Sequence, residues 1–293
     1  MEPITFADPA AVADALDGAG YLPDDGIATA AYLAMVMHRP LFLEGDPGVG
    51  KTALAVALAE ITRASLVRLQ CYEGIDASQA LYDWDFPRQI LHLRAAGDSV
   101  DTASLEASLY DRRFLVARPI LQALENSPSV LLIDEIDRAD DEFEAFLLEV
   151  LSENAVSIPE LGTIRALVPP IVVVTSNRTR EVHDALKRRC LYHWVAHPSF
   201  DREVEIVRRH LPEVGERLAR DVAGAVRRFR EAELLKPPGI AETIDWTQAL
   251  HVLGATSLDR DRALLTLGAA VKYHEDQVRV ERDVLPELLE RLG

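Results

Sequence analysis

The stretch LFLEGDPGVGKTALAVALAE, residues 41–60, begins as an apolar run, passes through three glycines and ends in an alanine-rich segment. This order predicts a buried strand, a tight loop and a helix. Gly45, Gly50, Lys51 and Thr52 have the spacing G-x-x-x-x-G-K-S/T, in which loop amides and the helix N-terminus surround phosphate groups. Lys51 is placed to reach the β- and γ-phosphates, and the Thr52 hydroxyl to bind Mg²⁺. The alternative is a glycine-rich turn that leads into a helix without a ligand.

Residues 41–196 alternate strand-like and helix-like segments. The short apolar runs are typical of parallel strands that are covered on both faces, and helical stretches such as residues 143–151 carry apolar residues on one side. The predicted strands are Pro40–Glu44, Leu66–Gln70, Val130–Asp134, Ile171–Ser176 and Leu191–Val195. The sequence therefore predicts a doubly wound α/β domain.

The strand pattern stops after Pro198, and amphipathic helical segments follow on either side of the loop LKPPG at 235–239. We therefore expect two domains, an α/β domain over residues 1–198 and a small all-helical domain over residues 199–293.

The composition indicates which partners and which cellular compartment to expect. The chain has 293 residues and a formal net charge of −17, from 48 acidic and 31 basic residues, so nucleic acid is an unfavoured partner. The longest nearly apolar run, Ile27–Met37, is too short to span a bilayer. The N-terminus lacks the basic and apolar regions of a signal peptide. Cys71 and Cys190 are the two cysteines and no CxxC occurs, which suits a reducing compartment; we expect a cytoplasmic protein.

In the stretch VLLIDEID, residues 130–137, four apolar residues are followed by Asp134 and Glu135. At the carboxyl end of a buried parallel strand, Asp134 is predicted to hold Mg²⁺ together with Thr52, and Glu135 to polarise an attacking water. A solvated strand end is the alternative. The residues predicted to bind ATP are Gly45, Asp46, Pro47, Gly48, Val49, Gly50, Lys51, Thr52, Ala53 and Asp134.

Two further segments carry candidate catalytic groups. PIVVVTSN ends in Asn177, whose amide could reach between a γ-phosphate and the water near Glu135; helix capping by Asn177 or Ser176 is the alternative. ALKRRC carries Arg188 and Arg189 before the fifth strand. An arginine at a helix end can stabilise transition-state charge on a neighbouring subunit's phosphate, although a solvated basic helix end has the same pattern.

Together, GDPGVGKT, LLIDEID, VVVTSN and ALKRRC, followed by helices, resemble an AAA+ ATPase over nearly the whole chain. The segment LLIDEIDRADDEFEAFLLEVLSE with the following SIPELG resembles the MoxR branch, most closely its CoxD-type members, which assist the maturation of carbon monoxide dehydrogenases. The resemblance implies a P-loop AAA+ sheet of five parallel strands in the order 5-1-4-3-2 with an all-α lid. It also implies ATP and Mg²⁺ as cofactors, Asn177 as sensor 1, and Arg189 as the arginine finger, with Arg188 as the competing choice.

The resemblance further implies a hexameric ring, a von Willebrand factor type A protein as partner, and a metalloenzyme client. It makes ENAVSIPELGTIRAL a hairpin before sensor 1 and QCYEGIDASQALYDWDFPRQIL an insert, both facing clients at the pore. The sequence departs from the family pattern in the lid, where Trp246 stands in place of a sensor 2 arginine. We expect Trp246 to pack in the lid core.

Four functions fit these features. The first is a ring-forming ATPase that remodels a client during the maturation of a molybdenum-copper enzyme. The second is a MoxR-type activase of another enzyme, such as Rubisco or nitric oxide reductase. The third is a nucleic-acid-associated AAA+ ATPase, which the acidic composition disfavours. The fourth is a nucleotide switch with little turnover, against which Glu135 and the paired arginines argue.

Overall fold

The computed structural model describes residues 4–96 and 108–292. The chain divides into two compact units, which are described separately. The first comprises Met1–Glu44 and Lys51–Trp194, and the second comprises Gly45–Gly50 and Val195–Gly293.

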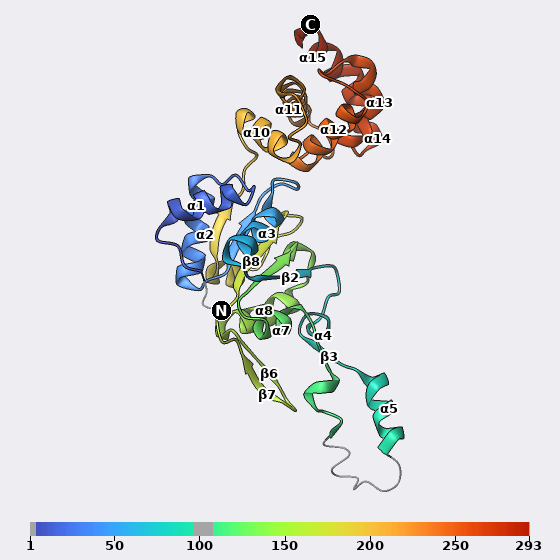
Figure 1. Ribbon diagram of the computed structural model, residues 1–293. Helices are drawn as coiled ribbons and strands as arrows, with labels where there is room; N and C mark the ends of the chain where they lie inside the picture. Colours follow the sequence, from blue (N-terminus) through green and yellow to red (C-terminus); the bar gives the residue numbers. More distant parts are fainter. Residues whose placement is uncertain (1–3, 97–107, 293) are drawn as a thin grey trace. The chain divides into compact units, whose positions relative to one another are not determined.

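The first unit is built on a five-stranded parallel sheet (Figure 1). Its strands are β1 (Leu41–Glu44), β2 (Ser65–Gln70), β5 (Ser129–Asp134), β8 (Ile171–Ser176) and β9 (Leu191–Trp194), in the spatial order β2-β5-β8-β1-β9. Numbered as five core strands and read from the opposite edge, this is the predicted order 5-1-4-3-2. The predicted strand bounds differ from the observed ones by at most one residue at either end. The predicted fold class is confirmed.

The apolar strands are explained by their burial. Every residue of β1 and of β5 is buried, so no polar face is needed. The helices of this unit are α1 (Pro9–Gly18), α2 (Asp25–Met37), α3 (Lys51–Thr62), α4 (Ala77–Ala80), α5 (Phe86–Ala96), α7 (Pro119–Glu125), α8 (Asp141–Glu153) and α9 (Asp184–Arg189). Helix α3 packs against β5 and β8, α7 against β2 and β5, and α2 against β1 and β9. Because all five strands are parallel, their carboxyl ends lie at one edge of this covered sheet.

Caps fix where helices begin and end. The Asp140 carboxylate accepts a hydrogen bond from the Phe143 amide at 2.8 Å and starts α8. Asn154 ends the same helix in a left-handed conformation, with φ 47°. Asp24 caps α2 in the same way, through the Ile27 amide at 2.7 Å.

Two small antiparallel sheets extend the first unit. Strand β3 (Tyr82–Trp84) pairs with β4 (Leu115–Ala117), and β6 (Ala155–Ile158) pairs with β7 (Gly162–Arg165). The second pair is the hairpin that the resemblance implies before sensor 1. The stretch compared with an insert forms α4, β3 and the first part of α5. Short 3₁₀ turns lie at Arg112–Phe114 and Ile136–Arg138.

The second unit is helical. It contains α10 (Phe200–His210), α11 (Glu216–Glu231), α12 (Ile240–Val252), α13 (Arg260–Ala270), α14 (His274–Arg279), a π-helical turn at Val280–Val284, and α15 (Leu285–Leu292). Trp246 lies fully buried in its core, 5.4 Å from the Phe229 ring centroid, and its Nε1 donates to Thr266 Oγ1 at 2.8 Å. The expectation that Trp246 packs in this core is confirmed.

A buried ion pair joins three helices of the second unit. Arg230 on α11 donates from both terminal nitrogens to the Glu203 carboxylate of α10, at 2.7 and 2.8 Å. The Thr243 hydroxyl of α12 donates to the same carboxylate at 2.6 Å. A bidentate pair fixes the orientation of the guanidinium relative to the carboxylate, in addition to pairing their charges. Within the residues that the structure describes, no helix of either unit is long and apolar enough to cross a membrane.

Candidate active site

The loop between β1 and α3 has backbone conformations that favour glycine. Gly48 and Gly50 have φ values of 77° and 97°, where a side chain would cost about 1–2 kcal/mol. The loop residues, which include Asp46, Pro47 and Val49, group with the second unit, whereas Lys51, Thr52 and Ala53 open α3 in the first. The chain therefore passes from a tight loop directly into a helix N-terminus.

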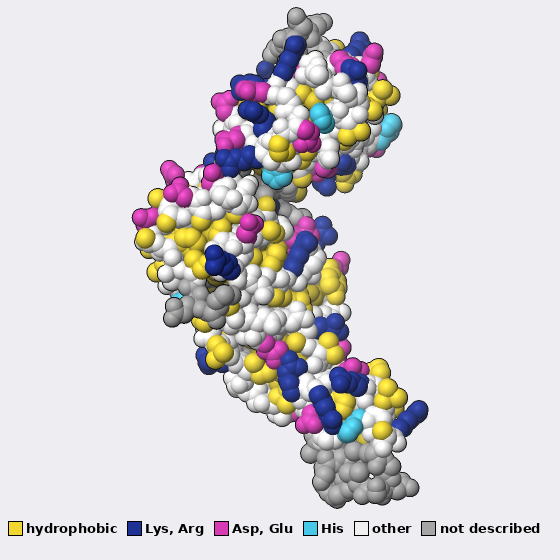
Figure 2. Space-filling model, in the orientation of Figure 1, with side chains coloured by type: hydrophobic (Ala, Val, Ile, Leu, Met, Phe, Trp, Pro, Cys, Tyr) yellow, Lys and Arg dark blue, Asp and Glu magenta, His cyan; other side chains and the backbone are white. Residues whose placement is uncertain are grey.

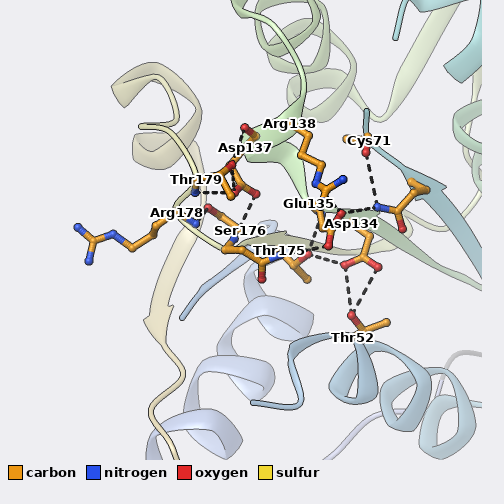
Figure 3. A network of polar contacts seen from close by, with 12 residues as sticks. Thr52, Cys71, Asp134, Glu135, Asp137, Arg138, Thr175, Ser176, Arg178 and Thr179 are labelled. Carbon is orange, nitrogen blue, oxygen red and sulfur yellow. Dashed lines mark hydrogen bonds and ion pairs between the residues drawn. The ribbon is translucent and has the colours of Figure 1, made fainter. Parts of the chain in front are cut away.

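Asp134 lies at the centre of a polar network at the end of β5 (Figure 3). Its side chain is almost fully buried. It accepts hydrogen bonds from the Thr52 hydroxyl of α3, at 3.2 Å, and from the Thr175 hydroxyl of β8, at 2.6 Å. Thr175 Oγ1 also accepts from the Glu135 amide at 2.9 Å. The Thr175 hydroxyl therefore couples Asp134, which ends β5, and Glu135, which follows it, to the neighbouring strand β8.

The Glu135 carboxylate points into the same network. Its backbone is left-handed, with φ 56°, an uncommon conformation for a residue with a side chain and one that often marks a functional position. Asn177 Nδ2 donates to Oε1 at 3.1 Å, and Gln70 Nε2 donates to Oε2 at 3.0 Å. Arg138 Nε lies 3.0 Å from Oε2. The structure thus brings Glu135 and Asn177 together, and α9 is capped by His183 rather than by Asn177 or Ser176.

Two arginines balance the charge of these acids. Arg68 Nη2 lies 2.5 Å from Asp134 Oδ2, and Arg138 contacts Glu135. Sequence reasoning missed Arg68, Gln70 and Arg138. Arg68 and Gln70 are two residues apart on β2 and share a face, and Gln70 stands opposite Asp134 in the β2–β5 register. That alternation of polar residues in a predicted strand was the available signal.

A second buried carboxylate fixes the loop that carries Asn177. Asp137 is 2% exposed and accepts from the Asn177 amide at 3.1 Å, the Thr179 amide at 2.8 Å and the Thr179 hydroxyl at 2.7 Å. Burial acts to raise the pKa of Asp137, but these hydrogen bonds outweigh it and hold the pKa below its ordinary value. The ionised carboxylate therefore holds the end of β8 against the end of β5.

The predicted arginine fingers lie at the end of α9. Both Arg188 and Arg189 are exposed. Arg189 Nη1 donates to the Leu148 carbonyl of α8 at 2.7 Å, while the Arg188 side chain has no hydrogen bond or ion pair with the described residues. Arg39 donates to the carbonyls of Arg188, Arg189 and Cys190 at 2.9–3.2 Å. The helix end is held by its backbone, and within residues 4–96 and 108–292 neither arginine side chain pairs with Asp134 or Glu135.

The two cysteines are buried and free. Burial raises the pKa of Cys71 to about 12, and the negative charges of Asp134 and Asp137 add to the effect. Burial also raises the pKa of Cys190 to about 12, against the opposing charge of Arg39. Neither thiol is therefore a ready nucleophile.

The donor set fits a magnesium nucleotide. Mg²⁺ prefers oxygen ligands, and it is commonly held by one or two protein groups, substrate phosphates and water. Thr52 and Asp134 supply a hydroxyl and a carboxylate 3.2 Å apart. No cluster of three or more His, Cys, Asp and Glu side chains suited to a metal ion occurs in the described part of the chain.

Comparison with known proteins places this arrangement in a family. The AAA domain of the dynein-related subfamily matches residues 40–190, slightly more than half of the chain. A stretch of 48 residues is 54% identical to midasin from Giardia intestinalis, covering 16% of this chain and 1% of midasin. The RuvB Holliday junction branch migration motor of Thermotoga maritima aligns with 18% identity and a TM-score of 0.46, over 81% of this chain and 65% of that one. The chain thus spans less than two thirds of either relative. The chain belongs to the dynein-related AAA domain family, and residues 40–190 form its AAA domain.

Proposed function

We propose that the chain hydrolyses ATP to ADP and phosphate and uses the energy to remodel a protein client. The observation that carries the proposal is the Glu135 carboxylate, which Asn177 and Gln70 hold beside Asp134 at the end of β5. A carboxylate in a fixed position next to a metal ligand can orient and deprotonate an attacking water.

Each predicted residue then has a role. The loop from Gly45 to Gly50 surrounds the phosphates with backbone amides, and Lys51 binds the β- and γ-phosphates. Thr52 and Asp134 hold Mg²⁺, which would neutralise charge on the phosphates. Glu135 acts as general base, and Asn177 links that base to the γ-phosphate.

We further propose that Arg189 completes the site of a neighbouring subunit, with Arg188 as the competing residue. AAA ATPases typically assemble into rings, and we expect a hexamer. Support comes from the exposure of both arginines at the end of α9, since an exposed guanidinium can reach another chain. An arginine supplied in trans can accelerate phosphoryl transfer by about 10³–10⁵-fold.

The client we propose is a metalloenzyme of the carbon monoxide dehydrogenase type, with a von Willebrand factor type A protein as partner, in the cytoplasm. This rests on the resemblance to the CoxD-type members of the MoxR branch. The charge of −17 favours a protein client over nucleic acid. On the face shown in Figure 2, Lys and Arg side chains are interspersed with Asp and Glu side chains rather than gathered in one basic stripe.

Mixed rings test the shared site. Lys51→Ala subunits lack a phosphate contact but keep their arginines, whereas Arg189→Ala subunits have the reverse defect. Mixtures should regain ATPase activity that neither protein has alone, and Arg188→Ala in place of Arg189→Ala identifies which arginine is the finger. Stable mixed rings without recovery for either arginine would remove the trans mechanism.

Copurification tests the client. Glu135→Gln protein should retain bound ATP and its client, whereas Lys51→Ala protein is the matched bait without nucleotide. A molybdenum enzyme and a von Willebrand factor type A protein enriched on the first bait would support the proposal. Rubisco, nitric oxide reductase or DNA enriched instead would contradict it.

A further inference from the structure

Glu44 is a charged residue in a buried strand. It ends β1, directly before Gly45, and is 4% exposed. It stands opposite Ser176 of β8 and Trp194 of β9 in the sheet. The other residues of β1 are apolar and fully buried. A carboxylate in such a place is costly unless cations accompany it.

Two cations from different segments accompany Glu44. Arg178 Nε, in the loop after β8, lies 2.8 Å from Oε1, and Lys187 Nζ, on α9, lies 3.2 Å from Oε2. Oε2 has no hydrogen bond of good geometry, so its contact with Lys187 is mainly electrostatic. The carboxylate therefore joins β1 to the segment after Asn177 and to the helix that carries Arg188 and Arg189.

Both cations are themselves held in place. Arg178 has a left-handed backbone, with φ 57°, and its guanidinium lies over the Trp194 ring, 5.5 Å from the centroid. Lys187 Nζ lies 5.7 Å from the centroid of the Phe42 ring. A left-handed arginine is strained by about 1–3 kcal/mol and persists only where its surroundings fix it. Each cation thus has an aromatic contact in addition to its ion pair with Glu44.

Stability alone does not account for this group. Only the carboxylate of these pairs is buried, since the Arg178 side chain is 63% exposed and the Lys187 side chain 30% exposed. Ion pairs of exposed cations contribute little to stability, so these pairs are weak evidence of a stabilising role. The alternative is a positional role. Arg39, which precedes β1, holds the carbonyls at the end of α9, and Glu44, which ends β1, holds the Lys187 side chain. Residues on either side of the β1 apolar run, Arg39 before it and Glu44 after it, thus both contact α9 or its C-terminal end.

We propose that Glu44 is a positioning residue which, through Lys187, sets the orientation of the α9 arginines that a subunit presents to its neighbour. The inference rests on the proposed trans arginine. Displacement of a catalytic group by about 1 Å can cost about 10²-fold in rate. Loss of the Glu44 charge should therefore lower the activity of the neighbouring site, while nucleotide binding within the same subunit changes little.

The first test measures α9 directly. Glu44→Gln keeps the size of the side chain and removes its charge; Glu60→Gln makes the same change at an exposed position of α3. Hydrogen–deuterium exchange should become at least threefold faster at the amides of residues 186–190 in Glu44→Gln, and remain unchanged in Glu60→Gln. Unchanged exchange at α9 would overturn the proposal whatever the ATPase assay shows.

Kinetics separate positioning from general damage. Glu44→Gln should lower kcat about tenfold or more and leave the affinity for a fluorescent ATP analogue within twofold. Lys187→Met should reproduce the loss, and Lys187→Arg should restore most of the activity because it keeps the cation. Equal losses in Lys187→Arg and Lys187→Met would contradict a role for this ion pair.

Mixed rings decide which site is affected. Glu44→Gln subunits combined with Lys51→Ala subunits should regain activity, because the latter present intact arginines to intact sites. Combination with subunits lacking both Arg188 and Arg189 should give no recovery. If Lys51→Ala and the arginine-less subunits do not complement each other, the trans mechanism fails. If they do, but Glu44→Gln with Lys51→Ala gives no recovery, the inference about Glu44 alone is wrong.

Discussion

Asp137 offers a direct test of how the loop carrying Asn177 is held. Its buried carboxylate accepts three hydrogen bonds from the Asn177 and Thr179 region. Asp137→Asn keeps the shape but places an amide donor where an oxygen accepted. At least one N–H or O–H of the loop then faces another donor.

The expected cost follows from these contacts. A hydrogen bond to a charged group contributes about 1.5–3 kcal/mol, and Asp137→Asn weakens all three while losing at least one. We expect a loss of about 3 kcal/mol in the free energy of unfolding, or about 10²-fold in the folding equilibrium. Asp141→Asn is the control, since that side chain is 83% exposed and its pair with Arg180 spans 3.3 Å; it should cost less than about 0.5 kcal/mol.

The effect has a defined pH dependence. The native pKa of Asp137 is lowered, so the folded chain binds this proton less readily than the unfolded chain, where the pKa is about 3.9. The stabilisation is therefore complete above about pH 4 and is lost as the pH falls through the native pKa. Urea unfolding at pH 7 and below pH 4, with amide exchange at residues 177 and 179, measures it. A cost at pH 7 equal to that of the control, or the same cost at both pH values, would show that the ionised Asp137 carboxylate does not hold this loop.

Two further predictions concern stability and reactivity. Trp246→Ala should destabilise the helical unit by about 3–5 kcal/mol. Thr266→Val removes the hydroxyl that accepts from the indole and donates to the Arg262 carbonyl, and it should cost about 1 kcal/mol; equal costs in thermal unfolding would argue against core packing. Cys71 and Cys190 should resist iodoacetamide at pH 8 in the folded chain and react in urea, because burial raises both pKa values to about 12; rapid labelling of native protein in mass spectrometry would contradict this.

The sheet was predictable because its strands leave clear patterns. Parallel strands that are buried on both faces read as nearly continuous apolar runs, and β5 and β8 each contain a run of four apolar residues. Functional groups follow at their carboxyl ends, which is where Asp134, Glu135 and Asn177 were expected. In the structure Asn177 donates to Glu135, and Thr175 contacts both Asp134 and Glu135. The role of each of these residues stays a proposal.

Spacing could place Arg68 and Gln70 on one face of a predicted strand, but it could not identify their cross-strand neighbours. Arg68 and Gln70 meet the acidic residues only through the register of β2 with β5. Glu44 meets Lys187 across more than 140 positions of sequence. Likewise β3 and β4 are three-residue strands far apart in the chain. They are too short to show the alternation of apolar and polar residues by which a strand is recognised.

We propose that Glu135 is the base for ATP hydrolysis. The decisive measurement is a rapid-quench single turnover of radiolabelled ATP by Glu135→Gln rings beside the unsubstituted protein, with nucleotide affinity determined on the same samples. We predict ATP affinity within threefold of the unsubstituted protein and a hydrolysis rate at least 10²-fold lower, within the about 10²–10⁴-fold expected of a general base. Hydrolysis of bound ATP at the normal rate by Glu135→Gln would contradict the account.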